Sequence, residues 1–407
     1  MKSRDRLLIL ADDLTGALDS GVQLARKGQN VVILTDRDVP FPEEASADVM
    51  VIDTETRHVD PGTAAQIVET LVRIAAQHGY ERIYKKTDSG LRGNIGAELE
   101  AVLKASGRDH LNFIPAYPAT DRKTIDGVQY VNGQPLAESI FAHDPINPIT
   151  VSRVDELIHQ QSRVPAGPAE AQGQAKKGIV VYDAESNEDL KRIADELEKE
   201  DDFMLTGGCA GFLEVFPVAK QQTSIPEIRL TQNRLLVLSG SVNEITRSQL
   251  TYARQQGGLS VHVPMDLIVK GKWTRNEKQR YLHELIQNAG DNPLILVDTL
   301  GEISEDLTLD PGQLAEVIAE NMGCLANEIA DTLPSYVMMI IGGDTLQGFI
   351  RSRHIQELHP IAEIDPGIVA ASYEESGTEH YIITKSGAFG SPDQLIRILN
   401  WIQKHQK

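Results

Sequence analysis

The sequence is poor in cysteine and has no long apolar run. Its 407 residues include two cysteines, Cys209 and Cys324, which lie far apart and match no paired metal-ligand spacing. This indicates a reducing compartment and no zinc site. After MKSRDR only LLILA precedes two aspartates, which is too short for the apolar part of a signal peptide, and no later run approaches a membrane span. We therefore expect a cytoplasmic protein without a membrane partner.

Positive charge is also scarce. The chain has 39 Lys+Arg against 59 Asp+Glu, which gives a formal net charge of -20. A nucleic-acid surface needs an extended basic face, so no nucleic-acid partner is expected. An anionic substrate must then be bound by a local basic pocket.

Two common nucleotide-binding signatures are missing from the sequence. There is no G-x-x-x-x-G-K-[ST] run and no G-x-G-x-x-G run, so neither the P-loop nor the dinucleotide-binding fingerprint applies. A dehydrogenase is disfavoured for the same reason. Any nucleotide site must be built from other elements.

Apolar runs alternate with amphipathic segments, and this alternation predicts an α/β fold. The runs RLLILAD, VVILT, VMVIDTE, RIYKKT, LNFIPA, GIVVYDA and FMLTGG are typical of strands. The rhythm breaks at EVFPVAKQQTSIPEIRLTQN and resumes with RLLVLSG, PLILVDT and YVMMIIGG. The length also favours two domains. We expect two α/β domains with mostly parallel sheets and a cleft between them, at residues 1–218 and 234–407, joined by a linker at 219–233.

A long irregular segment, residues 115–152, interrupts the first domain. It contains Asn132-Gly133, a dipeptide typical of a β-hairpin turn, and later FAHDPINP. Loops of this length in a compact domain are usually functional or disordered. The aromatic and apolar content of the segment favours an ordered lid or interface.

The stretch KKTDSGLRGN, residues 85–94, lies between a predicted strand and a predicted helix. Open parallel sheets bind ligands at the carboxyl ends of their strands, where helix N-termini present free amide groups. The glycines of this stretch allow the backbone to approach a ligand closely. An anion is therefore expected to meet Lys85, Lys86, Asp88, Ser89 and Arg92. The alternative is a solvated loop with ordinary surface ion pairs.

Three further polar residues follow other predicted strands. Asp12 and Asp13 could bind a metal ion, accept hydrogen bonds from hydroxyl groups or remove a proton. The alternative is that one of them only caps the following helix, since aspartate is a common N-cap residue. Arg57, in IDTETRHV, offers a planar fork that suits a carboxylate. Such a site fits a small polyhydroxy acid, because its cations can bind the carboxylate of the ligand and its aspartates can bind the hydroxyl groups of the ligand.

Small residues follow three predicted strands of the second half. They lie in LSGSVNEIT, IIGGDTLQGF and ITKSGAFGS. Each alone is ordinary turn chemistry. Three of them in one domain indicate phosphate or nucleotide binding through backbone amides.

Six motifs stand in a characteristic order: ADDLTGALDSG, KKTDSGLRGN, FAHDPINPI, SGSVNEIT, GGDT and TKSGAFG. In this order they resemble the four-carbon acid sugar kinases, which phosphorylate tetronates with ATP, over nearly the whole chain. The resemblance implies an N-terminal domain that binds the sugar acid, a C-terminal domain that binds the nucleotide, and catalysis in the cleft between them. It implies a nucleotide site of Ser241, Gly342, Gly343, Asp344, Thr345 and Gly387.

The same resemblance, added to the residue patterns, gives an expected substrate site of Asp12, Asp13, Arg57, Lys85, Lys86, Thr87, Asp88, Ser89 and Arg92. A kinase of this type holds the C4 hydroxyl in line with the γ-phosphate, with Mg²⁺ bridging the phosphates. Asp88 or Asp13 is the expected base, and the sequence does not choose between them. It assigns no metal ligands.

The motifs also bear on the substrate. Most members of the family read KKIDSTLRGN, whereas this chain has Thr87 and Gly90. FAHDPINP resembles D-threonate kinases more than 3-oxo-tetronate kinases, whose segment resembles HHPLTPM. D-threonate is therefore the favoured substrate, with 3-oxo-tetronate and D-erythronate as alternatives. A sugar-acid sensor is the non-enzyme alternative, since it needs the first site without the nucleotide glycines, and a homodimer is left open.

Overall fold

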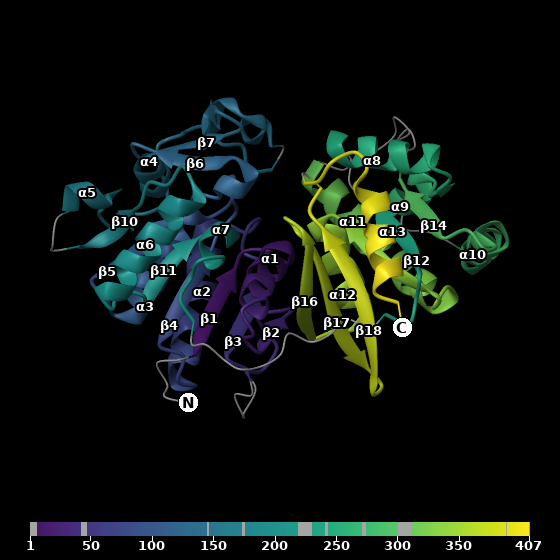
Figure 1. Ribbon diagram of the computed structural model, residues 1–407, viewed down its shortest axis with the longest axis horizontal. Coiled ribbons are helices and arrows are strands. Elements are labelled where there is room, and N and C mark those ends of the chain that lie inside the picture. The colour runs from purple at the N-terminus through teal and green to yellow at the C-terminus, as the bar shows by residue number, and fades with distance from the viewer. Residues whose placement is uncertain are drawn as a thin grey trace. The chain divides into compact units, whose positions relative to one another are not determined.

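The chain of the computed structural model divides into two compact units, Met1–Ile225 and Pro226–Lys407 (Figure 1). The structure describes residues 6–41, 47–144, 146–172, 176–218, 230–240, 243–270, 274–299, 311–387 and 389–406. Most of the predicted linker lies outside these residues. The domain bounds and the cleft stay predictions, while the α/β class with two domains is confirmed.

The N-terminal unit alternates strands and helices. Its elements are β1 (Leu7–Ala11), α1 (Leu14–Ala25), β2 (Val31–Leu34), β3 (Val49–Asp53), α2 (Pro61–Gln77), β4 (Arg82–Lys86), α3 (Ile95–Ser106), β5 (His110–Ile114), η2 (Pro118–Thr120), β6 (Arg122–Ile125), β7 (Val128–Val131), β8 (Gln134–Pro135), η3 (Leu136–Glu138), η4 (Ile140–His143), α4 (Val154–His159), β9 (Ala166–Pro168), α5 (Ala169–Gln172), β10 (Gly178–Val181), α6 (Asn187–Lys199), β11 (Leu205–Gly208) and α7 (Ala210–Leu213).

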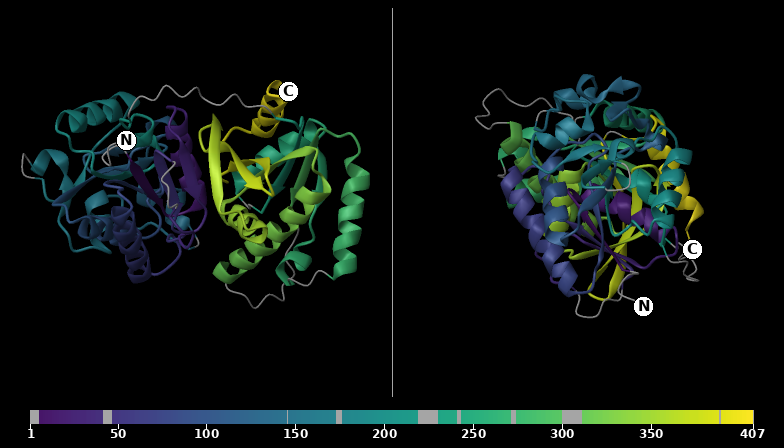
Figure 2. Two further views of the ribbon diagram at one scale, coloured as in Figure 1. Left: turned by 90° about the horizontal axis from the view of Figure 1, so that it is seen from below. Right: turned by 90° about the vertical axis from the view of Figure 1, so that its left-hand side faces the viewer.

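The main sheet of this unit is parallel, in the order β2-β3-β1-β4-β11-β5-β10-β9. Several of its strands, such as β1, β2 and β3, are nearly continuous apolar runs because helices cover both faces, as Figure 2 shows. The chain leaves β1 toward β2 and β3 on one side and returns to β4 on the other. The strand order therefore reverses between β1 and β4, and ligands bind at such a switch point in open α/β sheets.

The long segment after β5 is ordered. Strands β6, β7 and β8 form a small antiparallel sheet, and the 3-10 helices η3 and η4 follow. Asn132 and Gly133 both have positive φ, 50° and 75°, between β7 and β8, which confirms the predicted hairpin. Below, "lid segment" means residues 136–144 and 146–149.

The C-terminal unit has the same alternation and then a change of pattern. Its elements are β12 (Arg234–Ser239), α8 (Glu244–Gln255), β13 (Leu259–His262), α9 (Met265–Lys270), α10 (Arg275–Ala289), β14 (Leu294–Asp298), α11 (Pro311–Thr332), β15 (Tyr336–Ile341), α12 (Gly343–Arg353), β16 (Glu357–Asp365), β17 (Ile368–Glu375), β18 (Thr378–Lys385) and α13 (Gln394–Lys404).

Its strands follow the order β13-β14-β12-β15-β18-β17-β16. The first five are parallel, whereas β17 and β16 are antiparallel to their neighbours. Here the strand order reverses between β12 and β15. Below, "binding edge" means the carboxyl ends of these two strands, because ligands bind at such a switch point in open α/β sheets. Each unit has its own buried apolar cluster, one around β1, β4 and β5 and one around β12 and β15.

Among the described helices, none is both long and apolar enough to span a bilayer.

Candidate active site

The polar residues that follow β1, β3 and β4 meet at the switch point of the N-terminal sheet. Arg57 Nε donates to Asp12 Oδ2 at 2.8 Å, and its Nη1 donates to Asp13 Oδ2 at 2.7 Å. Its Nη2 lies 3.8 Å from Asp88 Oδ1. The Arg57 side chain is 11% exposed. The sequence suggested that the Arg57 guanidinium binds the substrate carboxylate. In the structure it is already bound to carboxylates of the protein.

Asp13 is both a helix cap and a member of this cluster. Its Oδ1 accepts from Gly16 N at 2.8 Å at the start of α1, and its Oδ2 accepts from Thr15 Oγ1 at 2.6 Å. Burial opposes ionisation of Asp13, but Arg57, Lys86 and the Thr15 hydroxyl outweigh it and lower the pKa of this carboxyl below its usual value. The side chain is 21% exposed, so a substrate can reach it.

Asp88 is held in a fork by its neighbour in the loop after β4. Arg92 Nε donates to Asp88 Oδ2 at 2.8 Å and Arg92 Nη2 donates to Asp88 Oδ1 at 3.1 Å. Burial raises the pKa of Asp88, but the charges of Arg92 and Arg57 outweigh it and hold this pKa far below its usual value. A carboxylate bound in this way is a weak proton acceptor. Its geometry suits the orientation of Arg92.

Arg92 also connects the cluster to the lid segment. Its Nη1 donates to Asp144 Oδ2 at 2.9 Å, and its guanidinium lies 5.0 Å from the centroid of the Phe141 ring. The ring packs on Gly90, where an added Cβ would lie 2.8 Å from it. Gly90 thus lets Phe141 approach the loop after β4.

We expect Gly90→Ala to displace the lid segment and to lower kcat/KM about 10-fold, because the new methyl group overlaps the Phe141 ring. Steady-state kinetics of the purified variant measure this. The matched control is Gly167→Ala, since a Cβ at Gly167 meets nothing within 4 Å. Equal activity of the two variants would show that the lid contact does not matter.

Lys86 contributes an uncommitted cation to the cluster. The residue is 4% exposed, and its ammonium forms no hydrogen bond or ion pair with any residue in the described part of the chain. A Cβ at Gly16 would lie 2.8 Å from Lys86 Nζ and 2.5 Å from Asp13 Oδ1, so both groups lie over this glycine. Its positive charge lowers the pKa of both Asp13 and Asp88.

Lys85 is placed elsewhere, which corrects the expectation that it faces the substrate. Its Nζ lies 2.6 Å from Glu98 Oε2 and donates to Leu10 O and Lys86 O at 3.1 and 2.8 Å. Neighbouring residues of a strand point to opposite faces, so Lys85 and Lys86 cannot share one site. Lys85 forms a buried structural ion pair under α3.

The remaining expected residues of this loop are Thr87 and Ser89. Thr87 is buried, and its Oγ1 has no hydrogen-bond partner among the described residues. Ser89 is partly exposed. Asp12 Oδ1 is likewise buried without a described partner. Hydroxyl-rich ligands supply the donors and acceptors that such groups lack.

The described residues of the expected nucleotide site lie at the binding edge of the C-terminal sheet. Gly342 has φ 110° between β15 and α12, which only glycine adopts easily, and its N donates to Lys385 O at 3.0 Å. A Cβ at Gly240 would lie 2.5 Å from Thr345 Oγ1, so the turn after β12 touches the first turn of α12. On α8, Thr246 Oγ1 donates to Gly387 O at 3.0 Å.

Three other expected members remain, and the structure describes two of them. Gly343 and Asp344 begin α12, and Asp344 is exposed. Ser241 lies outside the described residues. The loops after β12, β15 and β18 therefore meet beside the N-terminus of α12, where backbone amides are free to bind an anion.

Comparisons with known proteins agree with this division. Residues 7–216 match the sugar-binding N-terminal domain family, and residues 236–395 match the nucleotide-binding C-terminal domain family. The chain belongs to the four-carbon acid sugar kinase family. A D-threonate kinase of Salmonella typhimurium is 29% identical, with 98% of this chain and 99% of the relative covered. A D-erythronate kinase of Heliobacterium modesticaldum is 28% identical, with 97% of each covered.

Solved structures show the same fold as this kinase. A Salmonella typhimurium LT2 protein, described as a tRNA synthase, gives a TM-score of 0.78 at 23% identity, with 97% of this chain and 98% of that chain covered. A Haemophilus influenzae protein gives 0.70 at 21% identity, with 97% and 100% covered. At these identities the likeness concerns the fold alone.

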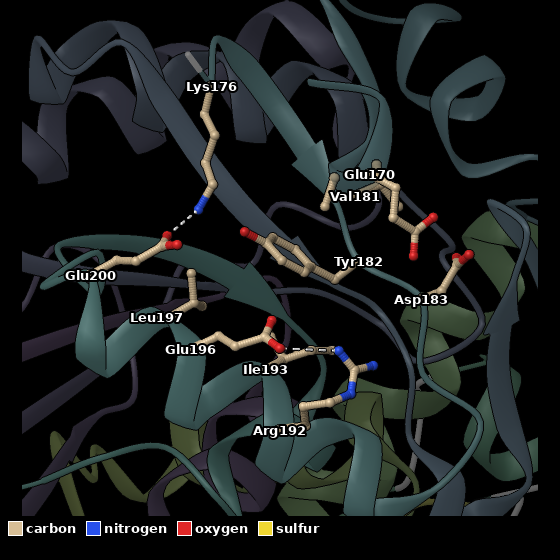
Figure 3. A pocket seen from close by; sticks show the side chains of 11 residues that line it. Glu170, Lys176, Val181, Tyr182, Asp183, Arg192, Ile193, Glu196, Leu197 and Glu200 are labelled. Atoms are coloured by element: carbon tan, nitrogen blue, oxygen red, sulfur yellow. Dashed lines mark hydrogen bonds and ion pairs between the residues drawn. The ribbon is translucent and has the colours of Figure 1, made fainter. Parts of the chain in front are cut away.

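A separate pocket of the kinase lies beside β10 and α6 (Figure 3). Four of its charged side chains form two pairs: Lys176 donates to Glu200 at 2.9 Å, and Arg192 donates to Glu196 at 3.4 Å. The Tyr182 side chain projects between these pairs in Figure 3. No residue of the expected substrate or nucleotide sites lines this pocket, so it is separate from both expected sites.

Sequence reasoning missed three residues that contact the cluster of Arg57, Asp13, Asp88 and Arg92. Thr15 bonds to Asp13, and Asp144 and Phe141 contact Arg92 from the lid segment. The motif FAHDPINP was the available signal for the last two. Its position far along the chain gave no indication of the contact.

Proposed function

We propose that this kinase transfers the γ-phosphoryl group of ATP to the C4 hydroxyl of D-threonate. The observation that carries the proposal is the lone Lys86 ammonium beside Asp13, one cation and one acceptor over a glycine floor. Two relatives named D-threonate kinase, 29% and 28% identical, favour this substrate. The enzyme class sets the sensor alternative aside.

In this proposal each residue of the cluster has one task. Lys86 binds the substrate carboxylate, and Arg57 holds Asp12 and Asp13 in place. Asp13, the most exposed of the three carboxylates at 21% against 4% and 11%, accepts the hydrogen of the C4 hydroxyl. Asp88 orients Arg92 and is a positioning residue. Asp13 is therefore our choice of base over Asp88.

A base of low pKa is compatible with this reaction. The attacking hydroxyl of a loose phosphoryl-transfer transition state keeps its proton until late, so the carboxylate first aligns the hydroxyl and then receives the proton. Positioning of this kind supplies much of the rate enhancement.

Mg²⁺ is part of the proposal as a partner of the nucleotide phosphates. The described residues contain no group of three acidic, His or Cys side chains that would hold a metal ion. Mg²⁺ in kinases binds through one or two carboxylates together with substrate phosphates, so such a group is not required. Asp344, at the start of α12 beside the phosphate loops, is the carboxylate that fits this role. The ion would neutralise charge on the transferred phosphoryl group.

The substrate is tested by a coupled ADP-release assay with D-threonate, D-erythronate and 3-oxo-tetronate at equal concentration. We expect the highest kcat/KM for D-threonate. A higher value for either of the other two acids would contradict the substrate assignment, and the relatives named D-erythronate kinase and 3-oxo-tetronate kinase make them the relevant competitors.

We expect Asp13→Asn to lower kcat about 10²-fold, with KM for ATP unchanged, because the amide keeps the shape but cannot take up the proton. Asp88→Asn is the comparison, and we expect a smaller fall of kcat. Because the pKa of Asp13 lies below its usual value, kcat/KM should show no acid limb above about pH 5. A larger loss for Asp88→Asn would make Asp88 the base.

A further inference from the structure

Lys385 is a buried cation without a carboxylate partner in the described part of the chain. It ends β18 and is 1% exposed. Among the described residues its ammonium donates only to backbone carbonyls, Ser386 O at 2.9 Å and Gly387 O at 3.4 Å. Isolated buried charges are costly, and carbonyl dipoles compensate them only in part. An anion, which the described chain does not supply, would therefore stabilise the charged form of this lysine.

The surroundings of Lys385 add to this requirement. Lys385 pairs with Ile341 at the end of β15, directly before Gly342 and the N-terminus of α12. That helix end carries the positive pole of the helix dipole and free backbone amides. Two positive features thus adjoin each other, and each would be stabilised by the same anion.

A second unsatisfied polar group lies in the same row of the sheet. Ser239, at the end of β12, pairs with Ile341 from the other side. It is 1% exposed, and its Oγ has no hydrogen-bond partner among the described residues. Residues paired across neighbouring strands lie on one face of the sheet, so the row Ser239, Ile341, Lys385 places a hydroxyl and an ammonium on one face at the binding edge.

We propose that Lys385 binds the polyphosphate of the nucleotide, with Ser239 as a weaker contact of the same polyphosphate. This rests on the nucleotide-binding assignment of the C-terminal unit and not on the identity of the sugar acid. The ammonium has three donors, and two carbonyls leave one for a phosphate oxygen. Lys385 also bonds to the carbonyls of the loop that contains Gly387, so it links the phosphate to this loop.

The titration of Lys385 gives an independent readout. Burial lowers the pKa of Lys385 to about 7. The row of paired strand ends that contains Lys385 also contains Asp298 of β14, which pairs with Arg254 and His262, and Asp365 of β16, which pairs with Arg397 at 2.8 Å. Asp344 lies in the first turn of α12 and Glu244 in the first turn of α8, and none of these carboxylates forms an ion pair with Lys385. A bound phosphate should raise the lysine pKa again, so ATP binding at pH 8 should take up protons.

The sign for stability follows from the same values. The unfolded lysine has a pKa of about 10.4. Between pH 7 and about pH 10.4 this lysine binds a proton more readily in the unfolded chain than in the folded chain. Its contribution to the free energy of unfolding of the nucleotide-free protein therefore rises with pH in this range.

The test is calorimetric titration of the full chain with Mg-ATP and with adenosine, which lacks phosphates. We expect Lys385→Met to weaken Mg-ATP binding at least about 10-fold, the scale of one charge-assisted hydrogen bond, and adenosine binding less than about 2-fold. Its Tm without nucleotide should be equal or higher, because an uncompensated buried charge is removed. Ser239→Ala should show the same pattern with a loss of about 3-fold, and the proton uptake at pH 8 should vanish in Lys385→Met only.

Lys404→Met, an exposed lysine of α13, is the matched control and should change none of these values. The proposal is overturned if Lys385→Met lowers the Tm and leaves Mg-ATP affinity unchanged, if both ligands weaken equally, or if the unmodified protein binds no Mg-ATP. Failure of the sugar-acid assignment is a separate result: Mg-ATP binds and depends on Lys385, but no tetronate is phosphorylated.

Discussion

Arg57→Ala should lower kcat/KM for D-threonate at least about 10³-fold and the free energy of unfolding by about 3–5 kcal/mol, because it leaves buried carboxylates without their partner. The guanidinium binds Asp12 and Asp13 at 2.8 and 2.7 Å and lies near Asp88. Without it these carboxylates repel one another, and the Asp13 side chain loses the bond that fixes its Oδ2.

Steady-state kinetics and chemical denaturation of the same preparation check this prediction. Arg57→Lys should restore only part of the activity, since an ammonium cannot span two carboxylates as the planar fork does. Arg73→Ala is the control, because Arg73 forms an exposed pair with Glu69 on α2 and should change stability by less than about 0.5 kcal/mol. A rise of KM alone, with stability unchanged, would show that Arg57 binds the substrate carboxylate directly, as the sequence suggested.

The second large effect is expected at Lys86. Lys86→Met should raise KM for D-threonate about 10²-fold or more, because the other described cations of the proposed site, Arg57, Lys85 and Arg92, are paired with protein carboxylates. The free energy of unfolding should fall less than in Arg57→Ala, since Lys86 forms no ion pair with a described residue and acts on Asp13 and Asp88 only through its charge.

The neutral polyol threitol separates charge recognition from general damage. The unmodified enzyme should phosphorylate it poorly, and Lys86→Met should change that slow rate less than about 3-fold. Lys104→Met removes an exposed lysine of α3 and serves as the control. If D-threonate and threitol lose activity equally in Lys86→Met, the carboxylate does not bind at Lys86.

The fold was largely predictable because its strands are buried on both faces. Short continuous apolar runs such as those of β1 and β15 are typical of buried strands. A polar motif that directly follows such a run must then lie at the end of the strand. β13 was not predicted, because its residues Leu259–His262 are only partly buried and carry a weak apolar signal.

The site was predictable in its members but not in its pairings. The Arg92 contact with Asp144 spans 52 residues of chain, and no local pattern records such a separation. The placement of Lys85 away from the site could have been predicted, because neighbouring residues of a strand point to opposite faces of the sheet, so Lys85 and Lys86 cannot both face the site. Its partner Glu98 lies at a buried position of α3. The Arg57 pairing also depended on tertiary structure, because three strand ends had to meet before its fork was seen to be occupied.

The most direct test of the account is the product formed from ATP and D-threonate, measured by proton-coupled ³¹P NMR. Transfer to the C4 hydroxyl places the phosphate on a CH₂ group, so we predict a phosphomonoester signal split into a triplet and formed in step with ADP. A doublet would mean that a secondary hydroxyl is the acceptor. Inorganic phosphate alone would mean that the enzyme does not transfer the phosphoryl group to this acid, and either result would contradict the proposed function.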